Sequence, residues 1–354
     1  MLRNLIDRAA KAERFIFLEY FILAEGKLWD ELEKTLCAKA REGVEVKIIF
    51  DDFGNIKRFS GETIDRLREV GVEVFIFNPV HEYVNRLHFN YRDHRKIACI
   101  DGDVAYTGGV NIADEYANII ERFGYWKDSG VCLEGDGAWG LTASFIRMCV
   151  NLGGVMHNEH DYYRPHTPVK SEGFCQPFTD GPQNNPDNPA EDVFLQMISG
   201  ARRFLYITTP YFIPDGSVMR ALCIAGDGGV DVRLMLPGKP DHWYADCVAE
   251  SYFGELIKHG VKVYRYTPGF LHGKSIMVDR VAAFVGSVNM DYRSFELDYE
   301  CGVMVYSAPM IESLLEDMDM IVDHSRLVTK EEWAKRSVLR RVFEPLLRLF
   351  AIWM

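Results

Sequence analysis

The feature that most constrains the fold is a short motif that occurs twice. The first copy, HRKIACIDGDVAYTGGVN, begins at His94, and the second, HGKSIMVDRVAAFVGSVN, begins at His272. Each copy carries His, Lys, Asp, Gly and Asn in the same order, and every matching residue of the second copy lies 178 positions further along the chain. A single His-x-Lys-x4-Asp can arise by chance, but two copies with the same downstream tail cannot. The chain therefore contains a duplicated unit.

Strand geometry suggests what the duplicated residues do. If the apolar runs HRKIACI and HGKSIMV are strands, their period of two puts His94 beside Lys96, and His272 beside Lys274. Two histidines and two lysines that converge on one point describe a phosphoryl-transfer site without a metal. The lysines hold the non-bridging oxygens, one histidine attacks phosphorus, and the other protonates the leaving oxygen.

Each motif continues into a turn and a run of small residues. Asp101-Gly102 predicts a two-residue hairpin that returns VAYTGG beside the first strand, and Asp279 ends the second apolar run at the same place. The small residues that follow allow backbone to approach a ligand, and the asparagines next to them offer neutral donors. We therefore expect the substrate phosphate to be bound by Gly109, Asn111, Ser287 and Asn289.

These residues resemble one known family. The duplicated motif is the signature of the phospholipase D superfamily, and the chain is most similar to the bacterial cardiolipin synthases within it. The resemblance is carried by FDDFGN from Phe50, NYRDHRK from Asn90, GGVNIADEY from Gly108, TTPYFIPD from Thr208 and NMDYRSFELDYE from Asn289. It implies a phosphatidyltransferase that makes cardiolipin from two phosphatidylglycerol molecules, releases glycerol, passes through a phosphohistidine, and needs no cofactor or metal.

The order of apolar segments predicts the fold class. In the first half, the strand-like runs RFIFLEYFIL, VEVKIIFDD and VEVFIF alternate with helical patterns over 2–12, 27–41 and 62–70. The second half replays this order with TTPYFIPD, GVDVRLMLP and GVKVYRY. We predict two similar layered α/β domains of the phospholipase D type, related by a pseudo-twofold axis, with the active site at their interface.

Composition places the domain boundaries. We expect a first domain over 1–165, a connecting loop rich in Pro, Asn and Gly over 166–188, and a second domain over 189–336. The tail over 337–354 predicts an amphipathic helix, with arginines on one arc and apolar residues on the other. Such a helix either lies in a bilayer interface or packs on the protein body.

The resemblance also implies a carboxylate beside each catalytic histidine. Asp128, in WKD, and Glu300, which ends ELDYE, occupy the places where the family has acids that hold the imidazole ring. Asp298 departs from the Asn that is usual there, and leaves open which acid orients His272. The predicted catalytic set is His94, Lys96, Asp101, His272, Lys274 and Asp279, in which the two motif aspartates are expected to brace the domains.

Two other groups of polar residues leave alternatives open. Glu19 is charged within an apolar run, so it faces either the site or an edge. His157, His160, Asp161 and His166 imitate a metal cluster, but their spacing fits no standard zinc pattern. We therefore expect no metal there, and favour a substrate-entrance loop or a plain surface loop.

Charge and cysteine usage bound the remaining possibilities. A formal net charge of −12 argues against a general nucleic-acid binder, and docking on an anionic membrane would need a local basic or apolar patch. Eight cysteines without a C-x-x-C pair indicate free thiols in a reducing compartment. No run of about eighteen apolar residues occurs, so we expect either a short form bound peripherally to the bacterial cytoplasmic membrane or a chain whose start has been trimmed.

Within this reading some assignments stay open. We assign the attack on phosphorus to His94 and the acid role to His272, although the near symmetry of the motifs allows the reverse. A phospholipase D that releases phosphatidic acid is the main alternative, and a nuclease or a non-catalytic lipid-binding relative is less favoured. The expected partners are phospholipids and a membrane surface, without nucleic acid. The acceptor lipid or alcohol and the oligomeric state are not predicted.

Overall fold

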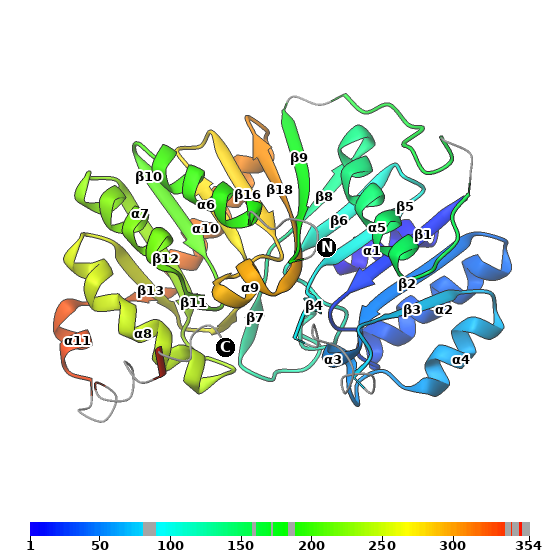
Figure 1. The fold of residues 1–354 in the computed structure, drawn as a ribbon, viewed down its shortest axis with the longest axis horizontal. Coiled ribbons are helices and arrows are strands. Elements are labelled where there is room, and N and C mark those ends of the chain that lie inside the picture. Colours follow the sequence, from blue (N-terminus) through cyan, green and yellow to red (C-terminus); the bar gives the residue numbers. More distant parts are fainter. Residues whose placement is uncertain are drawn as a thin grey trace.

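The chain forms two α/β units that lie side by side. The computed structural model describes residues 1–80, 90–157, 161–170, 173–182, 188–336, 341 and 347–348. In Figure 1 the first unit is on the right, in blue and cyan, and the second is on the left, in green to orange. Each unit is built around a sheet with helices, which confirms the predicted fold class.

The first unit contains a sheet in the order β3-β2-β1-β5-β6-β8. Its strands are β1 (Phe15–Tyr20), β2 (Glu45–Asp51), β3 (Glu73–Phe77), β5 (Lys96–Ile100), β6 (Val104–Gly108) and β8 (Gly130–Glu134). β1, β2 and β3 run parallel, and β5, β6 and β8 follow in antiparallel fashion. Every residue of β1 and β5 is buried because helices cover both faces, which explains their continuous apolar runs.

The second unit repeats this strand order. Its strands β13-β12-β10-β15-β16-β18 match the first unit position by position, with the same parallel and antiparallel pairs. They are β10 (Phe204–Thr208), β12 (Asp231–Pro237), β13 (Lys262–Tyr266), β15 (Ser275–Val278), β16 (Ala282–Gly286) and β18 (Asp298–Tyr306). The shorter strands are β4 (Arg92–Asp93), β7 (Tyr125–Lys127), β11 (Phe212–Ile213), β14 (Gly269–Leu271), β17 (Met290–Asp291) and β19 (Ser325–Leu327).

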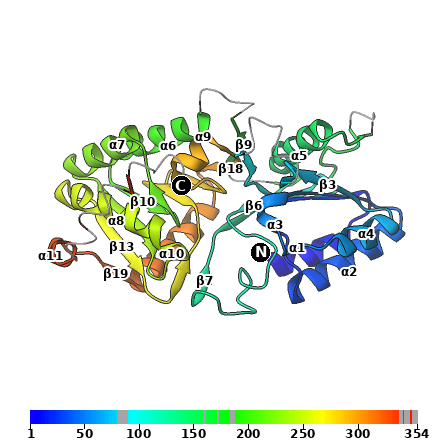
Figure 2. The same ribbon diagram turned by 60° about the horizontal axis from the view of Figure 1, so that its bottom comes forward.

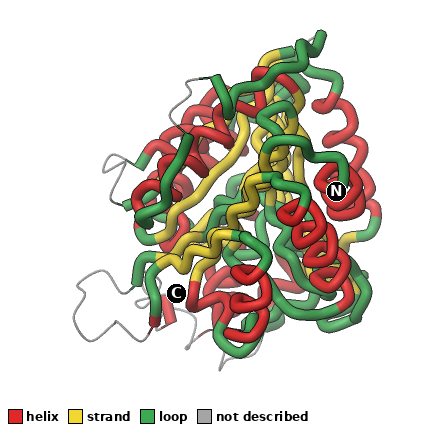
Figure 3. Tube along the Cα trace, turned by 90° about the vertical axis from the view of Figure 1, so that its right-hand side faces the viewer, coloured by secondary structure: helices red, strands yellow, loops and turns green. Residues whose placement is uncertain are grey.

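The helices are α1 (Leu2–Ala9), α2 (Lys27–Arg41), α3 (Asp52–Asn55), α4 (Gly61–Glu69), α5 (Trp139–Asn151), α6 (Pro189–Gly200), α7 (Gly216–Asp227), α8 (Trp243–Lys258), α9 (Tyr292–Glu296), α10 (Met310–Asp323) and α11 (Lys330–Ala334). Three apolar clusters hold these helices on the sheets. One packs α1, α2 and α4 on the outer face of the first sheet, and one packs α6, α7 and α8 on the second. The third lies between the sheets and joins α5 to α10, so it fixes the two units relative to each other. Figure 2 shows α5 on the opposite side of the first sheet from α1, α2 and α4, and Figure 3 shows helices on both sides of the strands.

Several predicted elements are confirmed, and two differ. The helix over 27–41 is α2, and a hairpin at Asp101-Gly102 joins β5 to β6, with φ of 54° and 73° at these residues. Its loop has three residues, since Ile100 pairs with Val104, and not the two that were predicted. The strands of the two motifs begin later than expected, at Lys96 and at Ser275. His94 and His272 therefore lie just before their strands.

Part of the segment predicted as a connecting loop is a strand. Within 166–188, β9 (Phe174–Asp180) pairs antiparallel with β18. Its Pro and Gly suggested a loop, but Pro177 is tolerated because β9 is an edge strand that pairs on one side only. The amphipathic helix predicted over 337–354 lies outside the described residues, apart from 341 and 347–348.

Candidate active site

Two short strand pairs join the units and position the histidines. β4 runs parallel to the start of β18, and the His94 N–H donates to Tyr299 O at 2.9 Å. β14 runs parallel to β7, and the His272 N–H donates to Lys127 O at 2.6 Å. Each histidine is therefore held by backbone of the other unit, and both lie at the boundary between the units.

A carboxylate from the opposite unit holds each imidazole ring. His94 Nδ1 lies 2.8 Å from Glu300 Oε1, and His272 Nδ1 lies 2.7 Å from Asp128 Oδ2. The structure thus places both predicted acids beside a histidine, and the acid next to His272 is Asp128, not Asp298 or Glu300. Contact at Nδ1 leaves Nε2 of each ring as the nitrogen available for chemistry.

Both histidines line one cavity of about 640 Å³ at this boundary. The two predicted asparagines line it as well. Asn111 is fixed there, because its Oδ1 accepts from the Ile22 N–H at 3.0 Å and its Nδ2 donates to the Tyr116 hydroxyl at 2.9 Å. Asn289 is 6% exposed, and its Oδ1 has no hydrogen-bond partner among the described residues. The cavity therefore holds polar groups that a phosphate oxygen could contact.

The two lysines lie beside the histidines and are almost fully buried. Lys96 Nζ donates to His94 O. Lys274 Nζ donates to His272 O at 2.7 Å and lies 2.9 Å from His272 Nε2. Burial lowers the pKa of Lys96 to about 8 and that of Lys274 to about 7. The charge of Lys96 also acts on Lys274, so an anion near both is favoured, although neither lysine is among the residues that line the cavity.

Burial and neighbouring charges also shift the pKa values of the histidines and their acids. Burial, with the charges of both lysines, holds the pKa of His94 well below its usual range. Burial and Lys274 lower the pKa of His272 to about 4. Burial raises the pKa of Glu300 to about 8. Burial alone would also raise the pKa of Asp128, but the charge and hydrogen bond of His272 and the charge of Lys274 bring it below its ordinary value. Asp128 is therefore the more firmly ionised acid.

Among the described residues, three aromatic rings surround His272, whereas one, that of Phe21 at 5.2 Å, contacts His94. The rings of Tyr116, Trp126 and Phe270 lie 5.4, 5.1 and 5.7 Å from the ring of His272. The Trp126 indole N–H also donates to Asp128 Oδ2 at 3.3 Å. His272 is thus held in an apolar and rigid environment.

The other histidine has a carboxyl group, that of Asp298, at the equivalent position, and burial holds the pKa of this group well above its usual range. The register of the two strand pairs makes Asp298, opposite Arg92, the counterpart of Trp126, which lies opposite Phe270. Asp298 lines the cavity, and its Oδ1 lies 3.4 Å from Arg293 Nε but accepts no hydrogen bond from any described residue. The two halves of the cavity therefore differ in polarity.

The predicted Asp101 and Asp279 lie outside this cavity. Each stands in a left-handed turn, with φ of 54° and 53°. Their carboxylates accept backbone N–H groups at 2.7 to 2.9 Å from Glu13, Arg14 and Phe15 in the first unit, and from Arg202, Arg203 and Phe204 in the second. Both aspartates thus anchor the start of the first sheet strand within their own unit, and neither joins one unit to the other.

Gly109 and Ser287, predicted to bind phosphate, lie behind the acids. A Cβ at Gly109 would stand 2.2 Å from Asp128 Oδ1, so the glycine is what allows this carboxylate to approach His272. At the equivalent place in the second unit, the Ser287 hydroxyl donates to Glu300 Oε2. Neither residue lines the cavity. The structure gives them contact with the acids and not with the ligand space.

Glu19, whose direction was left open, faces neither the cavity nor an edge. It is fully buried and forms an ion pair with Arg95, the residue between His94 and Lys96. The pair lies on the far side of the motif backbone from the cavity, since period two turns Arg95 away from its neighbours. Glu19 therefore supports the motif from behind.

Sequence reasoning assigned no role to most of the cavity wall, including Arg58, Tyr116, Arg122, Trp126 and Arg293. Three of these five had a signal. Tyr116 ends the quoted stretch GGVNIADEY. Trp126 precedes Asp128 by two residues, so in an extended chain the side chains of Trp126 and Asp128 lie on the same face. Arg293 lies in the quoted stretch NMDYRSFELDYE, whereas Arg58 and Arg122 lie in none, and only the folded chain brings these two to the cavity.

One group of described residues has the composition of a metal site. Potential ligand atoms of His94, Asp298 and Glu300 lie within 4.8 Å of one another. The histidine and glutamate already bond each other, and the charge of Lys96 acts on the same histidine, so a cation is opposed there. In the other candidate cluster the ring of His157 lies 4.3 Å from that of Tyr162, while residues 158–160 lie outside the described ranges.

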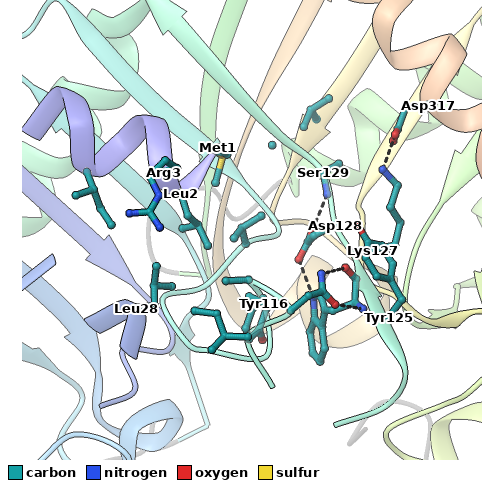
Figure 4. Close-up of a pocket in the computed structure, with 18 of the residues that line it drawn as sticks. Met1, Leu2, Arg3, Leu28, Tyr116, Tyr125, Lys127, Asp128, Ser129 and Asp317 are labelled. Atoms are coloured by element: carbon teal, nitrogen blue, oxygen red, sulfur yellow. Dashed lines mark hydrogen bonds and ion pairs between the residues drawn. The ribbon is translucent and has the colours of Figure 1, made fainter. Parts of the chain in front are cut away.

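A second cavity, of about 690 Å³, lies on the other side of Tyr116 and Trp126, which line both cavities. Figure 4 shows the start of the chain on one side of it and the pair between Lys127 and Asp317 on the other. Asp128 lines this space but bonds His272 away from it. Since the motif histidines and asparagines line the smaller cavity and not this one, we locate the chemistry in the smaller cavity.

Comparison with known proteins agrees with this geometry. A family profile described as "Cardiolipin synthase, PLD-like domain" matches residues 2–119 and 194–322. The chain belongs to this phospholipase D-like family. The two matched ranges contain both motifs, and the gap between them contains β7, β8 and α5 of the first unit together with the segment that leads to the second unit. As a member, the protein is an enzyme of the phosphatidyltransferase type found in the phospholipase D superfamily.

Individual relatives cover nearly the whole chain. A cardiolipin synthase of Halalkalibacterium halodurans is 36% identical over 342 residues, which are 96% of this chain and 67% of that protein. An uncharacterised protein of Streptococcus mutans is 38% identical over 345 residues, which are 96% of this chain and 74% of that protein. The crystal structure of a phosphatidylserine synthase from Haemophilus influenzae covers 99% of this chain and 90% of its own, with a TM-score of 0.72 at 15% identity, and so shares the fold. Among the described residues of this family member, no helix has the length and apolar character needed to cross a bilayer.

Proposed function

We propose that the enzyme joins two phosphatidylglycerol molecules into cardiolipin and releases glycerol. The observation that carries the proposal is the pair of imidazole rings, each held by a carboxylate from the opposite unit, that line one cavity next to two buried lysines. A nucleophile, an acid and fixed cations at one point are the groups that a two-step phosphoryl transfer requires. The names of the relatives support a phospholipid as the substrate.

In the first step, His94 Nε2 attacks the phosphorus of one phosphatidylglycerol. The N–P bond forms while the P–O bond to the headgroup glycerol breaks, and His272 gives its proton to the departing oxygen. Lys96, Lys274, Asn111 and Asn289 bind the phosphate. The negative charge of that phosphate offsets the lysine charges that lower the pKa of His272, so the ring can be protonated when the substrate is bound.

In the second step, the acceptor takes the place of glycerol. His272, now neutral, removes the proton from a headgroup hydroxyl of a second phosphatidylglycerol. That oxygen attacks phosphorus, the N–P bond breaks, and His94 leaves as the neutral base that began the cycle. Cardiolipin is released, and His272 is again protonated for the next turnover.

Three observations support this division of roles. Within the described residues His94 Nε2 has no hydrogen-bond partner, so it is available for attack, whereas His272 Nε2 lies 2.9 Å from Lys274 Nζ. The lowered pKa of Asp128 makes it the better partner for an imidazolium, which is the acid form of His272. The raised pKa of Glu300 does less to hold a proton on His94.

The proposed partner is a membrane surface, at the bacterial cytoplasmic membrane, with no role for nucleic acid. The net charge of −12 requires a local apolar or basic docking patch. Exposed large apolar side chains near the cavity support such a patch, with Phe53 55% exposed and Trp243 69% exposed. Phe53 lines the cavity itself, and Trp243 begins α8 directly before Tyr244, which also lines it.

A phospholipase D that passes the phosphatidyl group to water is the second candidate, because the cavity has 640 Å³ of space and water is the smallest acceptor. The test is incubation with labelled phosphatidylglycerol in micelles, beside His94→Ala and His272→Ala, followed by separation of the lipids. Cardiolipin and free glycerol, lost in both variants, are the expected products. Phosphatidic acid alone would replace the proposal with the hydrolase, and no turnover by the parent enzyme would contradict both.

A further inference from the structure

In the second step of the proposed reaction, two phosphodiesters lie in the cavity at once. The inference that follows rests on this proposed cardiolipin synthesis. The acceptor phosphatidylglycerol carries a phosphodiester of its own, in addition to the one that reacts. The two buried lysines are occupied by the reacting phosphate at that moment. A second anion close to the first is disfavoured unless another cation meets it. Water or glycerol, as neutral acceptors, make no such demand.

A pair of arginines on the cavity wall has the required charge. Arg58 Nη1 and Arg122 Nη1 lie 3.2 and 3.4 Å from one and the same atom, Glu115 Oε1. All three residues line the cavity, and their side chains are 32%, 49% and 9% exposed. One carboxylate thus holds two guanidinium groups side by side, and the group keeps one net positive charge. The described part of the chain provides no other hydrogen bond to either guanidinium.

The arginine pair stands on the side of the cavity where the acceptor arrives. Glu115 is followed by Tyr116, whose ring lies 5.4 Å from that of His272. The charge of Arg58 acts on the Tyr116 hydroxyl, which places this arginine next to the same ring. In the proposed mechanism His272 is the group that meets the acceptor hydroxyl. The pair and the incoming headgroup therefore share one half of the cavity.

We propose that Arg58 and Arg122 bind the phosphodiester of the acceptor lipid, so that an anionic phospholipid and not a neutral alcohol is the preferred acceptor. A phosphodiester carries one negative charge, which matches the net charge of the pair with Glu115. The planar fork of a guanidinium suits two phosphate oxygens at once. The third arginine of the wall, Arg293, does not serve this purpose because it lies near His94 and contacts Asp298 and Asn90.

The test compares two acceptors in one micelle preparation of phosphatidylglycerol. Cardiolipin formation uses the anionic lipid acceptor, and incorporation of labelled glycerol into phosphatidylglycerol uses a neutral one through the same phosphohistidine. For Arg58→Gln and for Arg122→Gln we expect the ratio of cardiolipin formation to glycerol incorporation to fall about tenfold, the worth of one hydrogen bond between charged groups. Arg66→Gln, at an arginine that pairs with Glu33 outside the cavity, is the matched control.

Two further variants distinguish the loss of a phosphate contact from misfolding of the protein. Glu115→Gln removes the carboxylate that competes with the lipid phosphate, so the concentration of phosphatidylglycerol needed for half-maximal cardiolipin formation should fall. Arg122→Lys keeps the charge without the fork and should give an intermediate ratio. An unchanged ratio in both Arg→Gln variants, or an equal loss of both activities, would overturn the proposal. A parent enzyme that incorporates no glycerol and makes no cardiolipin would instead overturn the function on which it rests.

Discussion

Replacement of Asp128 by Asn should slow the release of a poor leaving group and spare a good one. The proposed task of Asp128 is to stabilise the imidazolium of His272, which protonates the departing glycerol. Its Oδ2 lies 2.7 Å from His272 Nδ1, and its charge and hydrogen bond both act to raise the pKa of that ring. Asn keeps the size of the side chain but removes the charge. The proportion of protonated His272 therefore falls in the variant.

The size of the effect follows from the bond that is lost. A hydrogen bond to a charged group contributes about 1.5–3 kcal/mol, so glycerol release should slow about 10- to 150-fold. Asp128 is buried, which places the expected value toward the upper end because solvent does not screen the interaction. From a phosphatidyl ester of p-nitrophenol, the leaving group departs as nitrophenolate and needs no proton. The variant should therefore release nitrophenolate in the first turnover about as fast as the parent enzyme.

The assay is rapid-quench measurement of the two leaving groups, glycerol and nitrophenol, from matched lipids in micelles. Glu300→Gln is the paired variant, and it should slow both releases because the attack by His94 is common to both substrates. Equal losses on the two lipids in Asp128→Asn would refute the acid role of His272. A selective loss in Glu300→Gln, with both releases slowed in Asp128→Asn, would show that the two histidines have exchanged roles.

Three further predictions concern residues around this site. Gly109→Ala should lower kcat on phosphatidylglycerol about tenfold or more, because the added Cβ would stand 2.2 Å from Asp128 Oδ1 and displace this carboxylate. The melting temperature should change little, and steady-state kinetics measured beside thermal unfolding check both results. Lys274→Met should abolish transfer but raise the melting temperature near pH 7. The folded pKa of Lys274, about 7, lies below its unfolded value, so the unfolded state binds more protons between these values and the parent gains stability as pH rises. The advantage of the variant should be largest below pH 7 and fade toward pH 10 in pH-dependent melting curves. Asp101→Asn and Asp279→Asn should each lower the free energy of unfolding by about 1–2 kcal/mol, since they weaken bonds to backbone N–H groups, and urea unfolding beside transfer assays at low temperature should show lost stability with retained turnover.

The sequence was sufficient for the strands that the two halves share, because each of these strands is a local apolar pattern and occurs twice. Strand runs such as Phe15–Tyr20 and their copies follow from apolar periodicity, and the hairpin at Asp101 follows from its turn residues. The start of β5 and β15 could not be predicted in the same way. The backbone of His94 and His272 pairs with the opposite unit, and periodicity within one segment carries no information about a partner far along the chain.

The same limit applies to the candidate site. The residues Asp128 and Glu300 could be named from their stretches, but their crossed pairing depends on the exchange of β4 and β14 between units. The spacing that put Gly109 among phosphate ligands is equally explained by its contact with Asp128, and only packing separates these roles. The arginines near Glu115 come from separate loops and have no pattern at all.

The two motifs are nearly identical, so any division of labour between the histidines must come from their surroundings. His272 has a firmly ionised partner in Asp128 and rings of Tyr116, Trp126 and Phe270 around it. These features hold an imidazolium in one orientation once a phosphate has offset the lysine charges. On the other side, the position of Trp126 is taken by Asp298, next to a histidine whose pKa lies well below its usual range and whose acid is itself hard to ionise. A base that stays neutral can attack, and a ring that is held when charged can donate a proton. The asymmetry that catalysis needs therefore arises where the duplication has diverged, in the walls of the cavity and not in the motifs.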